Sequence, residues 1–79
     1  MDDRIWEAGW NQAKKLLKKG RVKTLYLASD ADDAFARTVL AEAKSAGISP
    51  DQTKTGDRLA ELAGVEVFTA VLTEVKKDQ

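Results

Sequence analysis

The sequence predicts a single α/β domain in which helices cover both faces of a small parallel or mixed sheet. Segments with helical apolar spacing alternate with short segments rich in β-branched and aromatic residues. A glycine follows each main helical segment, at Gly20, Gly47 and Gly64, where helices commonly end. No linker or repeat divides the 79 residues, so residues 1–79 form one domain with a small core. Alternation of helices and strands favours this layered arrangement.

The first half of the chain predicts two helical segments and a strand. Residues 4–8 are expected to form a short opening helical turn, and residues 10–19 a firmer helix that ends at Gly20. Residues 22–28 are rich in β-branched and aromatic residues and become apolar on both faces. This pattern favours a central strand covered on both sides.

The second half predicts a long helix and a weak strand. Asp32 or Asp33 is expected to cap a helix over about 33–46, because a carboxylate accepts from the free N–H groups of the first turn. Residues 48–53 predict a second strand, but Pro50 confines it to an edge position.

The last segments predict a short helix and a final strand. The helix begins at Thr55 or Asp57 and ends at Gly64. Residues 67–72 predict the third strand, and residues 76–79 a loose tail.

Composition excludes several functions. The chain has no cysteine and no histidine, which removes disulfides, cysteine or histidine metal ligands and most nucleophilic catalysis. No apolar run approaches about 20 residues, and the acidic N-terminus lacks the pattern of a signal peptide. We expect a soluble cytoplasmic protein that contacts no membrane, is not an enzyme, and carries no cofactor or metal.

Charge is unevenly distributed although the formal net charge is zero. Six of the 13 Lys and Arg residues lie between positions 14 and 23, where no acid occurs. On a helix over 10–19, Asn11, Lys14, Lys15 and Lys18 share one face, with Gln12 beside Asn11. Amides can read base edges and ammonium groups attract phosphates, so this face suits nucleic acid. The alternatives are a solvated lysine face and amides that only cap the helix.

Four stretches give the chain a family resemblance. They are Gly-Trp-Asn-Gln at 9–12 followed by Lys15, Leu-Lys-Lys-Gly-Arg-Val-Lys at 17–23, Leu-Ala-Ser-Asp-Ala-Asp at 27–32, and Leu-Ala-Glu-Leu-Ala-Gly-Val-Glu-Val at 59–67. Together they resemble the kink-turn-binding ribosomal proteins, the archaeal large-subunit protein seven-Ae and its short bacterial homologues. The resemblance covers about residues 8–75. It implies a three-layer α/β/α sandwich that binds a kink-turn, a sharply bent RNA duplex built around sheared G·A pairs.

The resemblance also implies where RNA would bind. Asn11 and Gln12 would contact the guanines of the G·A pairs, and Lys15 the same region or adjacent phosphates. The loop from Val65 to Phe68 would cover an extruded nucleotide. The expected partners are structured RNA and, in that setting, the ribosome. The candidate RNA-binding residues are Gly9, Trp10, Asn11, Gln12, Lys14, Lys15, Lys18, Glu66, Val67 and Phe68.

Two further hypotheses stay open from the sequence. Trp10 and Phe68 stand where the family usually has small residues. They either pack in the core, stack on bases, or anchor a protein or ligand partner on the same scaffold.

The carboxylates Asp30, Asp32 and Asp33 follow a predicted strand, where α/β enzymes place metals. Their alternative role is a turn followed by a helix cap.

Overall fold

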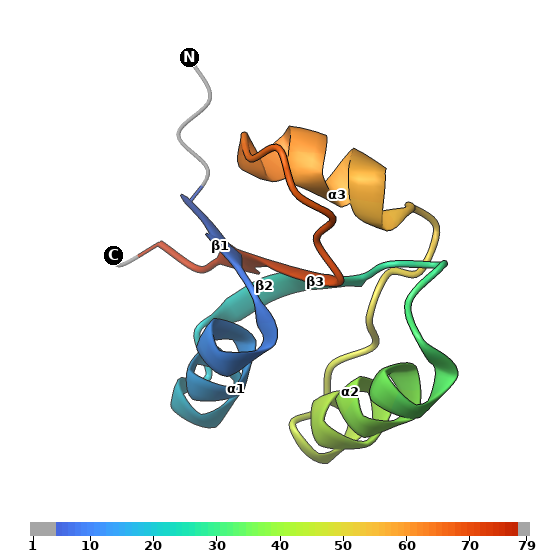
Figure 1. The fold of residues 1–79 in the computed structure, drawn as a ribbon. Helices are drawn as coiled ribbons and strands as arrows, with labels where there is room; N and C mark the ends of the chain where they lie inside the picture. The colour runs from blue at the N-terminus through green and yellow to red at the C-terminus, as the bar shows by residue number, and fades with distance from the viewer. Residues whose placement is uncertain (1–4, 78–79) are drawn as a thin grey trace.

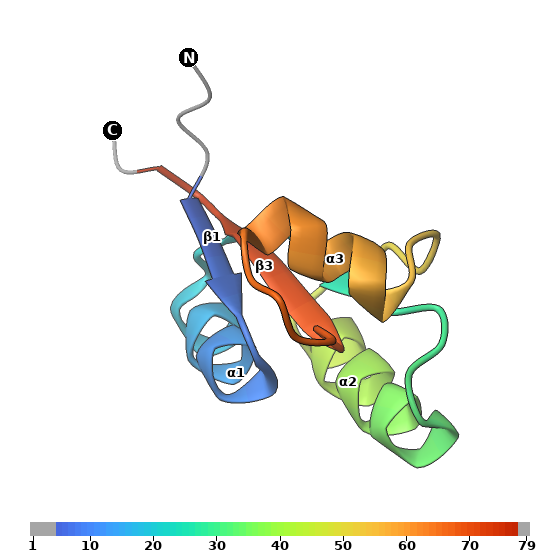
Figure 2. The same ribbon diagram turned by 45° about the horizontal axis from the view of Figure 1, so that its top comes forward.

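The computed structural model describes residues 5–77 and confirms an α/β domain with three helices. Helices α1 (Trp10–Lys19) and α2 (Asp33–Ser45) lie on one face of a three-stranded sheet, and α3 (Gly56–Ala63) lies on the other (Figures 1 and 2). The strands are β1 (Ile5–Ala8), β2 (Val22–Leu27) and β3 (Val71–Val75), in the spatial order β1-β3-β2. The architecture is therefore the expected three-layer α/β/α sandwich.

Strand β3 is the centre of the sheet, so the prediction that residues 22–28 form the central strand is wrong. β3 pairs antiparallel with both β1 and β2, and all five of its residues are buried. The three strands are therefore antiparallel throughout, and not parallel or mixed as expected. On the outer side of β2, Tyr26 forms an isolated parallel bridge with Asp51, outside the strands of the sheet. A bulge at Lys23 interrupts the register of β2, and the Lys23 ammonium lies 3.6 Å from the buried Glu74 carboxylate.

Side-chain alternation along the strands divides the core into two parts. Leu25, Leu27 and Val71 face α1 and α2, where they pack with Ala13 and Val39. On the opposite face, the smaller cluster contains Ala28, Leu59 and Leu72, with Trp6 and Tyr26 at its margin.

The helix boundaries agree well with the prediction because local side-chain and backbone signals set them. Asp32 Oδ2 accepts from the N–H groups of Ala34 and Phe35, at 3.1 and 3.2 Å, and so caps α2. Thr55 caps α3 in the same way. Gly20 and Gly64 end α1 and α3 in the left-handed conformation.

The N-terminal prediction is wrong, because residues 5–8 form a strand instead of a helical turn. Residue 4, where the turn was expected to begin, lies outside the described residues. Ile5 to Ala8 pair with β3, and Gly9 follows with φ 103° and ψ 154°. That backbone conformation is open mainly to glycine and prevents α1 from extending backwards.

Two other strand predictions require correction. Only Asp51 of residues 48–53 pairs with a neighbour, because Pro50 lacks an N–H and the Asp51 carboxylate accepts from Thr53 to form a turn. Residues 67–70 are a loop, and the strand runs from 71 to 75. Of the expected loose tail, residues 78–79 lie outside the described residues, whereas the Lys76 N–H donates to the Arg21 carbonyl at 2.8 Å.

Thr73 carries a fully buried hydroxyl with no hydrogen-bond partner. Thr73→Val keeps the branched shape and removes the unpaired hydroxyl, so we expect the free energy of unfolding to rise by about 1 kcal/mol in a urea titration. Thr69→Val is the matched control, since the buried Thr69 hydroxyl donates to the Val67 carbonyl at 3.1 Å and its loss should destabilise. Equal destabilisation by both variants would contradict this account.

Gly9 should be costly to replace for backbone reasons alone. No atom lies within 4 Å of the position of an added Cβ, so Gly9→Ala meets no steric obstacle. We expect a loss of about 1–3 kcal/mol in the free energy of unfolding, from the unfavourable φ and ψ. Asn11→Ala, two residues further into the same helix, serves as the control and should change stability little. An unchanged unfolding midpoint for Gly9→Ala would refute the backbone explanation.

Candidate nucleic-acid interface

The first turn of α1 presents two exposed amides that have no capping role. Gly9 is the N-cap of the helix, and no side chain bonds the amides of the first turn. Asn11 and Gln12 are both exposed. The capping-only interpretation of these side chains is therefore wrong, and their hydrogen-bonding groups face solvent.

Three separate segments meet beside this turn. The Gly9 N–H donates to the Val71 carbonyl at 2.9 Å, which fixes the start of α1 to the start of β3. The Ala28 N–H donates to the Ala70 carbonyl at 2.8 Å, which fixes the end of β2 to the same point. These bonds place the loop 65–70 next to the N-terminus of α1.

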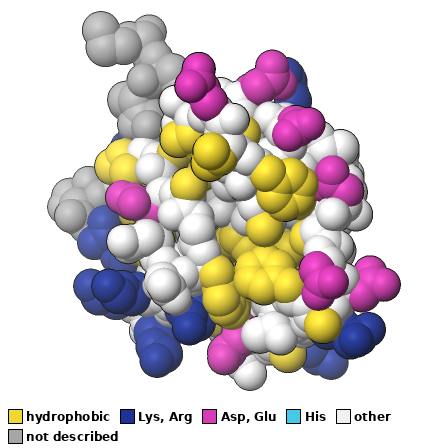
Figure 3. Space-filling view, in the orientation of Figure 1, with side chains coloured by type: hydrophobic (Ala, Val, Ile, Leu, Met, Phe, Trp, Pro, Cys, Tyr) yellow, Lys and Arg dark blue, Asp and Glu magenta, His cyan; other side chains and the backbone are white. Residues whose placement is uncertain are grey.

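An apolar hollow of about 250 Å³ lies between the N-termini of α1 and α2 and the loop 65–70. Figure 3 shows hydrophobic side chains gathered across the middle of this view and Lys and Arg gathered at the lower left. Such a hollow is large enough to accept part of a flat aromatic group. The residues that line it are Ala8, Gly9, Trp10, Phe35, Val65, Val67, Phe68, Thr69, Ala70 and Val71.

Trp6 and Trp10 lie on opposite faces of the sheet, because Trp6 belongs to strand β1 and α1 begins only at Trp10. Trp6 lies on β1 and faces α3, where its ring centroid is 5.9 Å from that of Tyr26. Trp10 is half-buried on the other side, and its ring meets Phe35 of α2 edge to face at 6.1 Å. Phe35 was not among the candidate site residues, so its part in the hollow was not predicted.

The residues of the loop 65–70 include three candidate site residues that are exposed. Val67 is 70% exposed and Phe68 50% exposed, and Glu66 is also exposed. The structure thus brings all three candidate loop residues to the surface. Val67 and Phe68 line the hollow together with Trp10.

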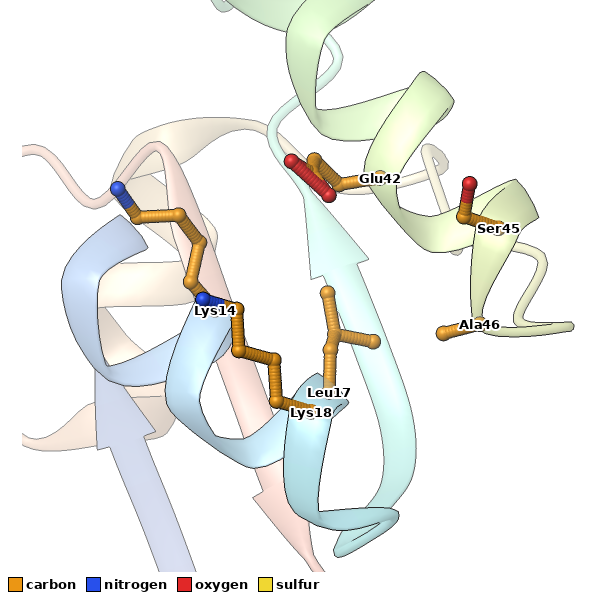
Figure 4. Close-up of a pocket in the computed structure, with 6 residues that line it drawn as sticks. All are labelled: Lys14, Leu17, Lys18, Glu42, Ser45 and Ala46. Carbon is orange, nitrogen blue, oxygen red and sulfur yellow. The ribbon is translucent and has the colours of Figure 1, made fainter.

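The candidate lysines fall into two environments. Lys15 is exposed and lies on α1 near Asn11. Lys14 and Lys18 line a groove of about 450 Å³ between α1 and α2, with Glu42 and Ser45 on the opposite wall (Figure 4). The Glu42 carboxylate offsets part of the positive potential there, so Lys15 is the better placed of the three for a phosphate. Lys14 Nζ also lies 5.8 Å from the centre of the Trp10 ring.

The acidic cluster at 30–33 has structural roles. Asp30 Oδ1 accepts from the Gly56 N–H at 2.9 Å, and Asp32 caps α2. Within residues 5–77, no three His, Cys, Asp or Glu side chains lie close enough together to hold a metal ion. The same part of the chain contains no helix long and apolar enough to span a membrane.

Comparison with known proteins shows a shared fold. No protein-family model matches the chain, and no curated protein matches it. A protein with unknown function from Bacillus halodurans C superposes with a TM-score of 0.79 at 24% identity, over 91% of this chain and 71% of that one. A Giardia lamblia 15.5kD RNA binding protein superposes with a TM-score of 0.79 at 23% identity, over 92% of this chain. This chain covers 62% of the Giardia protein, which is less than two thirds of its length. The α/β fold is therefore one that an RNA-binding protein also adopts.

Proposed function

We propose that this protein is a non-enzymatic RNA-binding domain that recognises and stabilises kink-turn RNA, in the manner of the kink-turn-binding ribosomal proteins. One observation carries the proposal: exposed, non-capping amides at Asn11 and Gln12 lie beside the apolar hollow of the loop 65–70. The shared fold with an RNA-binding protein supports an RNA partner in general. The resemblance at residues 9–12 and 59–67 supports the choice of a kink-turn.

The site combines two chemistries that a distorted RNA offers together. Amide side chains both donate and accept hydrogen bonds, so Asn11 and Gln12 match the exposed edges of sheared G·A pairs. A regular RNA duplex hides its base edges in a narrow groove, whereas bulges and loops expose edges and unstacked bases. Val67 and the aromatic rings of the hollow would cover one such unstacked base.

Stabilisation follows from preferential binding. A protein that binds the bent conformer of an RNA more tightly than the extended one shifts the population toward the bent form. Lys15, with Lys14 and Lys18, would add phosphate contacts that favour binding without choosing sequence. Binding within a ribosome or another ribonucleoprotein in the cytoplasm is part of the same proposal. The engagement of Asp30 and Asp32 in structural hydrogen bonds supports a non-enzymatic role.

The proposal is tested by replacing both amides. The Asn11→Ala, Gln12→Ala double variant should lose about 1–3 kcal/mol of binding free energy for a kink-turn, because each neutral hydrogen bond contributes about 0.5–1.5 kcal/mol. Its affinity for a plain duplex should stay unchanged, which a fluorescence titration of both RNAs would measure. Gln52→Ala removes another exposed amide far along the chain and is the control. Equal weakening for both RNAs would argue against base recognition.

Phosphate contacts predict a specific salt response. Lys15→Gln should reduce the slope of log K against log salt concentration by about 0.7–0.9, the contribution of one neutralised phosphate. Lys44→Gln, an exposed lysine in the last turn of α2, should leave the slope unchanged. The slopes come from titrations at four or more salt concentrations. If Lys44→Gln reduced the slope as much as Lys15→Gln, the charge effect would be general and the proposed contact wrong.

A second candidate function is a protein- or ligand-binding module with Trp10 and Phe68 as aromatic anchors. The exposure of Val67 and Phe68 beside the hollow favours it, since aromatic anchors dominate protein interfaces. Salt distinguishes the two functions: RNA binding should weaken steeply with salt, and an aromatic interface should not.

A further inference from the structure

Gly56 is the one glycine of this chain whose backbone does not call for glycine. The other four glycines all have positive φ, a conformation that other residues rarely adopt: Gly9, Gly20, Gly47 and Gly64. Gly56 has no such φ and is the first residue of helix α3. Alanine is preferred over glycine in helical backbone, so another constraint must act at this position.

The constraint is the ring of Phe68. An added Cβ at Gly56 would overlap three ring atoms of Phe68, because the ring rests directly on the Gly56 backbone. Gly56 is buried beneath it, while Phe68 itself remains half exposed. One side of the ring therefore contacts α3, and Phe68 also contributes to the lining of the apolar hollow.

Hydrogen bonds connect Gly56 to two further segments. Its N–H donates to Asp30 Oδ1 at 2.9 Å, from the turn after β2. Its carbonyl accepts from the Thr69 N–H at 3.1 Å, and the Thr69 hydroxyl donates to the Val67 carbonyl at 3.1 Å. The loop 65–70 is thus held to the first turn of α3 by one ring contact and one backbone bond at the same residue.

We propose that Gly56 is a positioning residue that seats Phe68 and thereby sets the shape of the apolar hollow. A side chain at position 56 would force the Phe68 ring off α3, and the displaced ring would alter or close the hollow that it lines. Resting on the proposed function, this makes Gly56 a determinant of how an unstacked nucleotide of the RNA is accepted, although Gly56 itself does not line the hollow.

The test is a double-mutant cycle of Gly56→Ala and Phe68→Ala, read first by thermal unfolding. Gly56→Ala should lower Tm in the native background. In the Phe68→Ala background the overlap is gone and alanine suits the helix, so the same change should leave Tm unchanged or raise it. This rescue separates a displaced ring from a general failure to fold. An equal loss of Tm in both backgrounds would show that Gly56 does not position the Phe68 ring, whatever the protein binds.

The second readout is binding to a kink-turn and to the same RNA made abasic at its unpaired loop nucleotide. The Gly56→Ala variant should bind the intact RNA about tenfold more weakly than the native protein does, a loss within the range measured for one stacked base. It should bind the abasic RNA with the affinity of the native protein. Its salt slope should match the native slope, since no phosphate contact changes. Native-like affinity of Gly56→Ala for the intact RNA would overturn the positioning role. If the native protein bound the kink-turn no more tightly than a plain duplex, the proposed function would be wrong. The Tm cycle would still test whether Gly56 positions the Phe68 ring.

Discussion

The pairing of β3 on both of its edges is the constraint on which the remaining structure depends. β3 holds β1 and β2 in register and separates the two parts of the core. Its first residue, Val71, accepts from the Gly9 N–H, and the preceding Ala70 accepts from the Ala28 N–H. The hydrogen bonds that begin the sheet therefore also place the start of α1 beside the loop 65–70. The pairing of β3 therefore sets both the packing of the core and the geometry of the candidate site.

The candidate interface places polar and apolar groups side by side at the end of that sheet. Asn11 and Gln12 are exposed and take no part in capping, since the N-cap of α1 is Gly9. The hollow beside them is bounded by aromatic rings that are fixed by other contacts: Trp10 by Phe35, and Phe68 by Gly56. Rings held in place before binding lose little freedom when a ligand contacts them, which favours affinity.

The sequence predicted best those features that local chemistry decides. Capping side chains predicted the starts of α2 and α3, and the glycines at 20, 47 and 64 predicted where the three helices end. The strands were harder because β3 includes Thr73 and Glu74, polar residues that only tertiary pairing buries. The position of Phe35 in the hollow and the contact of Phe68 with Gly56 escaped prediction, although Phe68 itself was a candidate site residue. Each depends on a partner distant in sequence, Trp10 for one and Gly56 for the other.

Whether this domain selects a bent RNA, as proposed, can be measured by energy transfer across a kink-turn. A kink-turn RNA labelled with a donor and an acceptor on its two arms would be titrated with the protein, beside a matched duplex that lacks the kink. We expect the transfer efficiency to rise for the kink-turn alone, with an apparent affinity that falls as salt increases. Equal binding of both RNAs, or binding without a change in transfer, would contradict it.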